Sequence, residues 1–249
     1  MTNKDMLQAV QEQLAIDMNC KIGDLSSGPG SIVFTEAREN PGRRPFPRGE
    51  EHFEMLTMGA AVVVSASPRL LEIIKPQLEG ASRDEAFSMP FVYGHGQFYL
   101  PDLAHIKPLV PPAGYEYDLA EQREILDLYK LEGFHYALGP GAGGPRPDVL
   151  AMFAVSDGII IGMAGASEDC ATMWQIGINV HDGHRRRGLA AYLVNRLTLE
   201  ILGRGRIPYY GTSSSNIASQ RVAHRAGYTP AWACAYRGRF GGVETSPTS

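Results

Sequence analysis

Between residues 172 and 203, a strand-like run, an arginine-rich turn and an amphipathic helix follow one another. The run "TMWQIGINV" (172–180) alternates apolar and polar residues in its second half, which predicts a strand. The helix after the turn has one apolar stripe, formed by Leu189, Leu193, Leu197 and Ile201. Gly203 predicts the end of this helix. A strand that leads into a helix through a short turn is typical of α/β proteins.

The turn reads "HDGHRRRGLA" (181–190) and places three consecutive arginines directly before the helix. The helix dipole disfavours a cation at this end by about 0.3–1 kcal/mol. A bound anion would offset that cost, because the free backbone N–H groups at a helix start favour phosphate. Small residues at Gly188 and Ala190 would let such a ligand approach the backbone. A solvated charge run and a nucleic-acid patch are the alternatives that this turn alone leaves open.

Charge is distributed unevenly along the chain. The formal net charge is −4. Residues 181–240 hold ten arginines and only two acids, which gives +8, whereas the remaining 13 basic and 25 acidic residues give −12. The C-terminal segment is therefore suited to an anion, and the whole chain is not suited to a polyanion. We expect no nucleic-acid partner.

The composition is that of a globular protein, with 249 residues, 44% hydrophobic and 20% charged. We find no apolar run of about 18 residues and no apolar signal core, so no membrane partner is expected. The three cysteines are an odd number without metal-ligand spacing, which favours a reduced, cytoplasmic protein. The histidines show no paired-ligand spacing either, so no metal site is expected.

The first hundred residues predict a mixed α/β unit. Residues 4–18 have helical spacing, residues 31–37 and 52–67 have strand-like runs, and Ser67-Pro68 predicts a helix start. The proline-dense segment 108–117 is typical of a connection between domains. We therefore predict an N-terminal α/β domain over 1–110 and a second domain over 111–249.

The arginine turn is one half of a longer pattern. It reads R-x-x-G-x-A and is followed by N-x-x-S at 216–219 and by Gly-Tyr at 227–228, eleven and twelve residues after Asn216. The GCN5-related N-acetyltransferase (GNAT) superfamily has a similar turn, Q/R-x-x-G-x-G/A, and a following helix of the form N-x-x-S/A that ends in G-F/Y. The chain therefore resembles this superfamily over roughly residues 115–240.

The resemblance implies an α/β (α+β) fold with a mixed, centrally splayed β-sheet flanked by helices. The chain is similar to a bacterial group in which a smaller α/β domain precedes the GNAT domain. Segments like "QLAIDMNC" (13–20) and "PGRRPF" (41–46) also occur in that group. In that group the N-terminal domain would shape the acceptor site or mediate dimerisation. The oligomeric state stays open, with a homodimer as one alternative.

The resemblance also implies acetyl-CoA as cosubstrate, without a metal. The backbone of Ile178, Asn179 and Val180 would bind the pantetheine arm. The turn would bind the diphosphate through Arg185, Arg186, Arg187, Gly188, Leu189 and Ala190. Asn216 and Ser219 would lie near the pantetheine or the adenosine diphosphate portion.

Two positions depart from the family's catalytic pattern. Many members have a glutamate as general base where this chain has Gln175, which could orient a water or the substrate. The nearest carboxylates are Glu168 and Asp169 at the end of the preceding strand, either as alternative bases or as exposed loop acids. Many members also have a tyrosine as general acid seven residues after the Asn, where this chain has Ala223. His224 is the candidate acid, although one helical position turns a side chain by about 100°.

The sequence thus predicts a cytoplasmic, acetyl-CoA-dependent N-acetyltransferase. Its acceptor would be the amine of a small molecule, either an amino-acid-like compound or an antibiotic. The alternative is a catalytically impaired module that binds acyl-CoA as a sensor or regulator. Release of free thiol in the presence of amines would distinguish the two.

Overall fold

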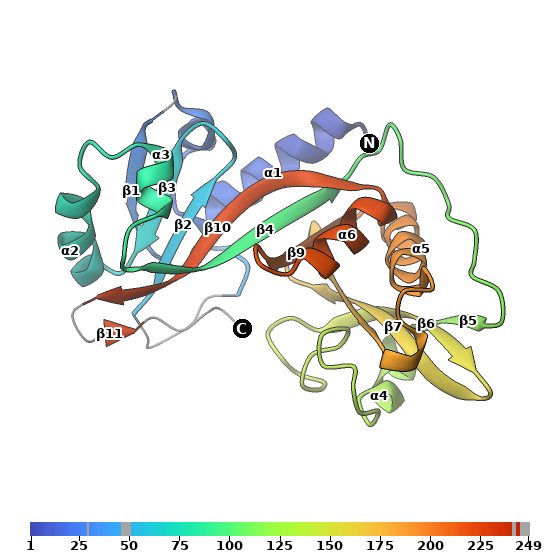
Figure 1. The fold of residues 1–249 in the computed structure, drawn as a ribbon. Helices are drawn as coiled ribbons and strands as arrows, with labels where there is room; N and C mark the ends of the chain where they lie inside the picture. Colours follow the sequence, from blue (N-terminus) through green and yellow to red (C-terminus); the bar gives the residue numbers. More distant parts are fainter. Residues whose placement is uncertain (29, 46–50, 241–242, 245–249) are drawn as a thin grey trace. The chain divides into compact units, whose positions relative to one another are not determined.

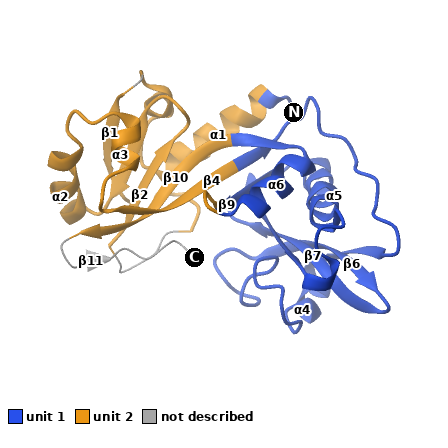
Figure 2. Ribbon diagram, in the orientation of Figure 1, with its two compact units in different colours: residues 1–3, 99–212, 216–230 blue, residues 4–98, 213–215, 231–249 orange. Residues whose placement is uncertain are grey.

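The computed structural model describes residues 1–28, 30–45, 51–240 and 243–244 (Figure 1). Within them the chain forms two compact units, shown in separate colours in Figure 2. Unit 1 contains Met1–Asn3, Tyr99–Thr212 and Asn216–Pro230, and unit 2 contains Lys4–Phe98, Ser213–Ser215 and the chain from Ala231 onward. Strands β4 (Val92–Pro101) and β10 (Tyr228–Phe240) each contribute residues to both units. The split into domains near residue 110 stays a prediction, and Phe46 of the "PGRRPF" segment lies outside the described residues.

Unit 2 is an α/β unit, as the alternation of helical and strand-like runs predicts. Its sheet has the strand order β1-β3-β2-β10-β4, with β1 and β3 parallel and β2 antiparallel to both β3 and β10. Its further elements are α1 (Asn3–Asp17), η1 (Ile22–Ser26), β1 (Ile32–Glu36), β2 (Phe53–Thr57), β3 (Val62–Ala66), α2 (Pro68–Leu78), α3 (Arg83–Phe87) and β11 (Val243–Glu244). Helix α2 begins at Pro68, the position that the sequence predicts.

Unit 1 contains an antiparallel meander that continues into a parallel crossover. Strands β5, β6, β7 and β8 are neighbours in sequence order, and β8 pairs with β9 in parallel after the helix α5. Its elements are β5 (Glu116–Glu121), η2 (Gln122–Glu124), α4 (Ile125–Leu128), β6 (Asp148–Ser156), β7 (Ile159–Glu168), β8 (Met173–Val180), η3 (Asp182–His184), α5 (Leu189–Gly203), β9 (Ile207–Ser213) and α6 (Ile217–Ala226).

The sheet of unit 1 opens between β8 and β9. The parallel pairing runs from Met173–Ile207 to Ile176–Tyr210 and then ends, although β8 continues to Val180 and β9 to Ser213. This confirms the prediction of a mixed sheet with a central splay. The last residues of β8 are therefore left with a neighbouring strand on one side only.

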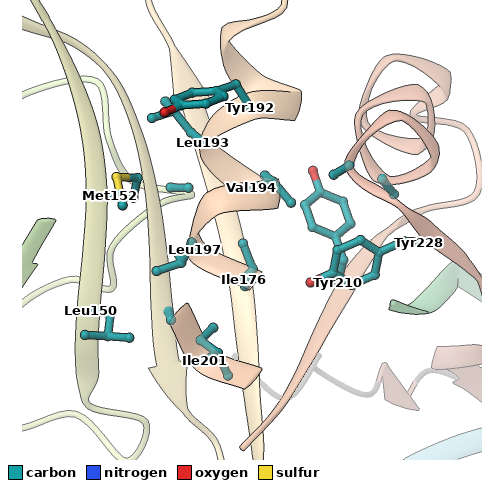
Figure 3. Close-up of a cluster of buried hydrophobic side chains, with 14 of the residues drawn as sticks. Leu150, Met152, Ile176, Tyr192, Leu193, Val194, Leu197, Ile201, Tyr210 and Tyr228 are labelled. Carbon is teal, nitrogen blue, oxygen red and sulfur yellow. The ribbon is translucent and has the colours of Figure 1, made fainter. Parts of the chain in front are cut away.

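Helix α5 covers one face of this sheet. The predicted stripe is confirmed, because Leu189, Leu193, Leu197 and Ile201 are all at most 1% exposed. Figure 3 shows Leu197 and Ile201 of the stripe near Ile176 of β8. Leu150 of β6 lies farther across the sheet. Burial of each such side chain stabilises the fold by about 1.5–3 kcal/mol. Helix α5 is therefore tightly packed on the sheet, and this packing fixes the position of its first turn.

A buried asparagine holds the segment before β5 against α5. Asn195, 1% exposed, accepts a hydrogen bond from the Leu109 backbone N–H (3.0 Å) and donates to the Lys107 carbonyl (3.1 Å). It also donates to the Ala226 carbonyl at the end of α6 (3.0 Å). One side chain therefore holds two chain segments against α5.

No helix in the described part of the chain is long and apolar enough to cross a bilayer.

Candidate acetyl-CoA site

The end of β8 presents unpaired backbone groups on the side of β9. The His181 N–H donates to the Ile161 carbonyl of β7 (2.9 Å). Because the direction of backbone hydrogen bonds alternates along an antiparallel strand, Gly177 and Asn179 also face β7, whereas Ile178 and Val180 face the opposite side. No residue of β9 is in register with Ile178 or Val180. An extended ligand with amide groups could therefore add to this edge as a strand would.

The turn after β8 leaves the first N–H groups of α5 open. Gly188 is the N-cap with φ +86°, and neither a capping side chain nor an acidic residue lies in the first turn. The Tyr192 N–H is the one that reaches back to the Gly188 carbonyl (3.1 Å), so the N–H groups before it have no acceptor within the helix. Arg186 also has a positive φ, 62°, which is unusual for a residue with a side chain. This end of the helix is suited to an anion.

The three arginines of the turn differ in their contacts. Arg185 folds back, with Nε donating to the Val180 carbonyl (3.0 Å) and Nη2 paired with Asp182 (2.9 Å). Arg187 donates to the hydroxyl of Tyr115 (3.3 Å). Arg186 is exposed and no contact of its side chain is described. Arg185 therefore stabilises the turn itself, while the other two guanidinium groups are available to phosphate oxygens.

A row of polar side chains crosses the other face of the same sheet. Asp148 of β6 is in register with Ser167 of β7, Ser167 with Gln175 of β8, and Gln175 with Tyr209 of β9. Residues in register share one face of a sheet, so these four side chains form a line from β6 to β9. The row ends next to the place where β8 and β9 separate.

Buried Asp169 organises this row. Its side chain is 1% exposed and accepts from the Ser167 hydroxyl (2.7 Å), from Arg146 Nη1 (3.3 Å) and from the Tyr209 hydroxyl. Arg146 and Tyr209 also approach the Gln175 side-chain oxygen, at 3.0 and 3.1 Å. Because a buried carboxylate needs several donors, Asp169 fixes the positions of both residues that hold Gln175.

At the other end of the row, hydrogen bonds to the Asp148 carboxyl only partly offset the effect of its burial. Burial raises the pKa of its carboxyl, and the backbone N–H of Gly139 and the Tyr129 hydroxyl, both 2.9 Å from Oδ2, oppose that shift. Burial likewise raises the pKa of Tyr129 to about 12, so its hydroxyl stays protonated and donates. Asp148 thereby fastens the loop before β6 to the sheet.

Comparison with known families agrees with this arrangement of strand, turn and helix. Residues 150–234, which run from β6 into β10, match the family model described as GNAT acetyltransferase. Over these residues the chain is similar to the GNAT acetyltransferase family, as the motifs predict. A comparison with curated proteins finds no match.

Solved structures with a similar fold include three GNAT proteins. The chain is 17% identical to one from Novosphingobium aromaticivorans (TM-score 0.41, covering 57% of this chain and 62% of that chain, less than two thirds). It is 16% identical to a GCN5-related N-acetyltransferase-like protein from Streptococcus suis (TM-score 0.42, 71% of both chains). It is 15% identical to a GCN5-related N-acetyltransferase from Kribbella flavida (TM-score 0.48, 73% and 70%). All three TM-scores are below 0.5, so they indicate neither substrate nor mechanism.

Among the residues that the GNAT resemblance assigns to pantetheine, Asn179 has another contact. Its Oδ1 accepts from the backbone N–H groups of Tyr136 and Ala137, both at 2.8 Å, and its backbone faces β7. Gly177 lies under the same loop, since a Cβ there would be 1.7 Å from the Tyr136 carbonyl oxygen. Asn179 and Gly177 therefore seat the loop around Tyr136, and Ile178 and Val180 are left as the open edge.

The three predicted catalytic residues are not brought together. Glu168 is in register with Trp174, so its side chain lies on the face opposite to Gln175. His224 is exposed on α6 with its ring edge-on to Tyr99, at 5.5 Å between centroids. Its neighbour Ala223 is fully buried, and this difference follows from the rotation of about 100° per helical residue.

The remaining predicted residues of the GNAT motif have clear local roles. Asn216 is the N-cap of α6 and accepts from the Ser219 N–H (3.1 Å), while the Ser219 hydroxyl lies 2.7 Å from the Tyr210 hydroxyl. Leu189 is buried, and Ala190 is half-buried at the start of α5. The N-x-x-S spacing therefore caps the helix, whatever else its polar groups bind.

Sequence reasoning missed Arg146, Tyr209 and the structural importance of Asp169. Asp169 follows a strand directly and has the pattern of an exposed loop acid. Its partners Arg146 and Tyr209 are distant in sequence, so no local signal identifies them. Within the described ranges no group of three or more His, Cys, Asp and Glu side chains is suited to a metal ion.

Proposed function

We propose that this chain is an acetyl-CoA-dependent N-acetyltransferase whose acceptor is the amine of a small molecule. The observation that carries this proposal is the continuity of two features within residues 178–191. The open strand edge at Ile178 and Val180 is followed, after one short turn, by a helix start with free N–H groups and exposed arginines. A ligand with an amide-bearing arm attached to a diphosphate matches both features.

The residues present fit coenzyme A. The N–H and carbonyl of Ile178 and the N–H of Val180 would pair with the amides of the pantetheine arm, while the Val180 carbonyl already accepts from Arg185. The diphosphate would lie against the first N–H groups of α5, with Arg186 and Arg187 as counter-charges. Gly188 adopts φ +86° and has no side chain, so the ligand could approach the backbone closely at this turn.

Acetyl-CoA supplies the thioester, and the chain supplies position. Holding an amine and a thioester in reactive geometry contributes several kcal/mol without an acid or base. Gln175 takes the place of a family carboxylate and cannot remove a proton from the amine. The amine would therefore react as the neutral form that it reaches by exchange with solvent.

A second candidate function is an acyl-CoA-binding sensor without turnover. It is favoured by Gln175 and Ala223, which replace a carboxylate and a tyrosine of the family pattern. This candidate predicts acetyl-CoA binding without thiol release for any amine. An N-acetyltransferase would show acetyl-CoA binding and also thiol release with at least one amine.

We also assign residues 1–110 to the acceptor site or to dimerisation, and the protein to the cytoplasm. The free thiols of Cys20, Cys170 and Cys234 support a reducing compartment. Crosslinking and size-exclusion chromatography would test the dimer. A bisubstrate analogue that carries a photoreactive amine arm would identify the acceptor-lining residues.

The decisive experiment compares two glycine-to-glutamate variants at opposite ends of α5. Gly188→Glu puts a carboxylate into the proposed diphosphate position. Gly203→Glu makes the same change of charge where no heavy atom lies within 4 Å, about 20 Å away along the helix. We expect calorimetric titration with acetyl-CoA to show at least a 100-fold loss of affinity for the first and little change for the second.

Equal affinity of the two variants would contradict the site. A Gly188→Ala variant controls for backbone strain, because it adds a Cβ at the same positive-φ position without adding charge. Thiol release over a panel of amines, measured on the wild type, then separates the enzyme from the sensor.

A further inference from the structure

The side-chain amide of Gln175 has one favoured orientation. The Gln175 atom that lies 3.0 Å from Arg146 Nη1 must be the oxygen, because a guanidinium group only donates hydrogen bonds. Turning the amide over would place its NH₂ against that cation. The chemistry of the partner therefore decides between the two orientations, which coordinates alone often leave ambiguous.

The groups that hold this amide are themselves anchored. Arg146 Nη1 also donates to Asp169, and so does the Tyr209 hydroxyl, which lies 3.1 Å from the Gln175 oxygen. Asp169 is nearly inaccessible and its second oxygen accepts from Ser167. Any rotation of the Gln175 amide would disturb donors to a buried carboxylate, so the orientation is maintained.

The consequence is that Gln175 presents donors only. Its oxygen accepts from Arg146 and faces the Tyr209 hydroxyl, which donates its single proton to Asp169, whereas its two amide N–H bonds have no described partner. Gln175 is half-buried, and the Arg146 side chain is 33% exposed. At the end of the polar row, next to the splay, the sheet therefore offers N–H groups where many GNAT members offer a carboxylate.

We propose that Gln175, positioned by Arg146, Tyr209 and Asp169, selects an acceptor that carries a hydrogen-bond-accepting oxygen close to its amine. This inference rests on the proposed N-acetyltransferase function. The oxygen belongs to a carboxylate or to a neutral carbonyl, as in an amino acid or its amide. Gln175 donates to that oxygen and orients the amine toward the thioester, and Asp169 is a positioning residue.

The transfer then needs no base on the protein. The ammonium form of the acceptor loses its proton to solvent, and the neutral nitrogen attacks the thioester carbonyl. The C–N bond forms and the C–S bond breaks, with the electron pair leaving on the sulfur of coenzyme A. The proton that the nitrogen then loses passes to solvent, and the thiolate takes up a proton from solvent to give the free thiol. Because Gln175 does not titrate, the rise of kcat/KM with pH should follow the pKa of the acceptor amine.

The test uses matched triplets of acceptors on the full-length protein. Each triplet contains an amino acid, its primary amide and the amine that lacks the carboxyl group, for several side chains. Thiol release gives kcat/KM for each compound. We expect at least one oxygen-bearing member to exceed its matched amine by 10-fold or more, because unpaired donors penalise the analogue that lacks the oxygen. The better of acid and amide identifies the charge of the oxygen-bearing group.

Two variants separate substrate selection from a structural role. Gln175→Glu keeps acceptors for Arg146 and Tyr209 but removes both donors, and Gln175→Leu removes all polar atoms. In both, we expect the preference for the oxygen-bearing acceptor to fall at least 10-fold while acetyl-CoA affinity stays within 3-fold of wild type. Gln175→Glu should also add a pH dependence that does not follow the amine.

The outcomes are distinguishable. Equal kcat/KM within every triplet, or an unchanged preference in both variants, would overturn the inference and leave the N-acetyltransferase intact. Binding of acetyl-CoA without thiol release for any amine would overturn both. An equal loss of activity for all acceptors in the variants, with preference retained, would show that the network only stabilises the sheet.

Discussion

Replacing Asn195 by alanine should destabilise the fold more than any change at a comparable exposed position of α5. The side chain makes three hydrogen bonds to the backbone, with Leu109, Lys107 and Ala226. It is 1% exposed, so water does not replace it in the native state. The substitution leaves those three backbone groups to find other partners.

The cost follows from how accessible each partner is. Ala226 is fully buried, and its carbonyl loses a partner at a desolvation cost of about 1–2 kcal/mol. The half-buried Leu109 N–H loses about 1 kcal/mol, while the carbonyl of exposed Lys107 can bind water and loses less. The total is about 3 kcal/mol. At roughly 2–4 °C per kcal/mol for a chain of this size, Tm should fall by about 6–12 °C.

Thermal and urea unfolding of Asn195→Ala and of Arg196→Ala measure this difference. Arg196 is the next residue and makes only a part-exposed ion pair with Glu200 (3.6 Å), so its loss should cost less than about 1 kcal/mol. The reasoning is refuted if the two variants unfold within 2 °C of one another. That result would mean that the segment before β5 is held by its other contacts and not by Asn195.

Two further predictions follow from the same structure. Gly177→Ala should displace the loop around Tyr136, because the added methyl would lie 1.7 Å from its carbonyl oxygen; thiol-release activity should fall at least 10-fold, whereas Gly183→Ala, with no atom within 4 Å, should be unaffected. Burial, aided by Arg43, lowers the pKa of His52 to about 3, so the unfolded chain binds a proton at pH 5 that the native state does not. Stability should therefore fall by about 2 kcal/mol from pH 7.5 to pH 5 in urea titrations, and His52→Gln should remove most of that fall.

Local sequence patterns predicted those features that depend on neighbouring residues. The stripe of α5 is spaced at three to four residues, and each of its four members is buried. Pro68 begins α2, because the preference of proline for the first helical position acts within one helical turn. The splay between β8 and β9 was predicted from the family resemblance and not from periodicity.

Features that depend on distant residues were not predictable in the same way. Gln175 was recognised by its place in a motif, but its partner Arg146 lies 29 residues earlier and Tyr209 lies 34 residues later. Glu168 and Asp169 look alike in sequence. The register of β7 with β8 shows that Glu168 lies on the opposite face from Gln175. The structure also shows that the Asp169 side chain is buried, in contact with Arg146 and Tyr209.

The arginine turn illustrates how charge and geometry constrain one another. Three cations at a helix start would cost up to about 1 kcal/mol each if nothing offset the dipole. Asp182 offsets the charge of Arg185, and that arginine also closes the end of the strand edge at Val180. Arg187 has only a neutral hydroxyl as partner, and the first turn of α5 contains no acid. Two positive charges and a set of free N–H groups are therefore left without an anion from the described chain at this turn. A diphosphate would satisfy both at once, whereas a carboxylate or a single chloride would satisfy only part of them, and this is why we propose a diphosphate-bearing ligand at this turn over a smaller anion.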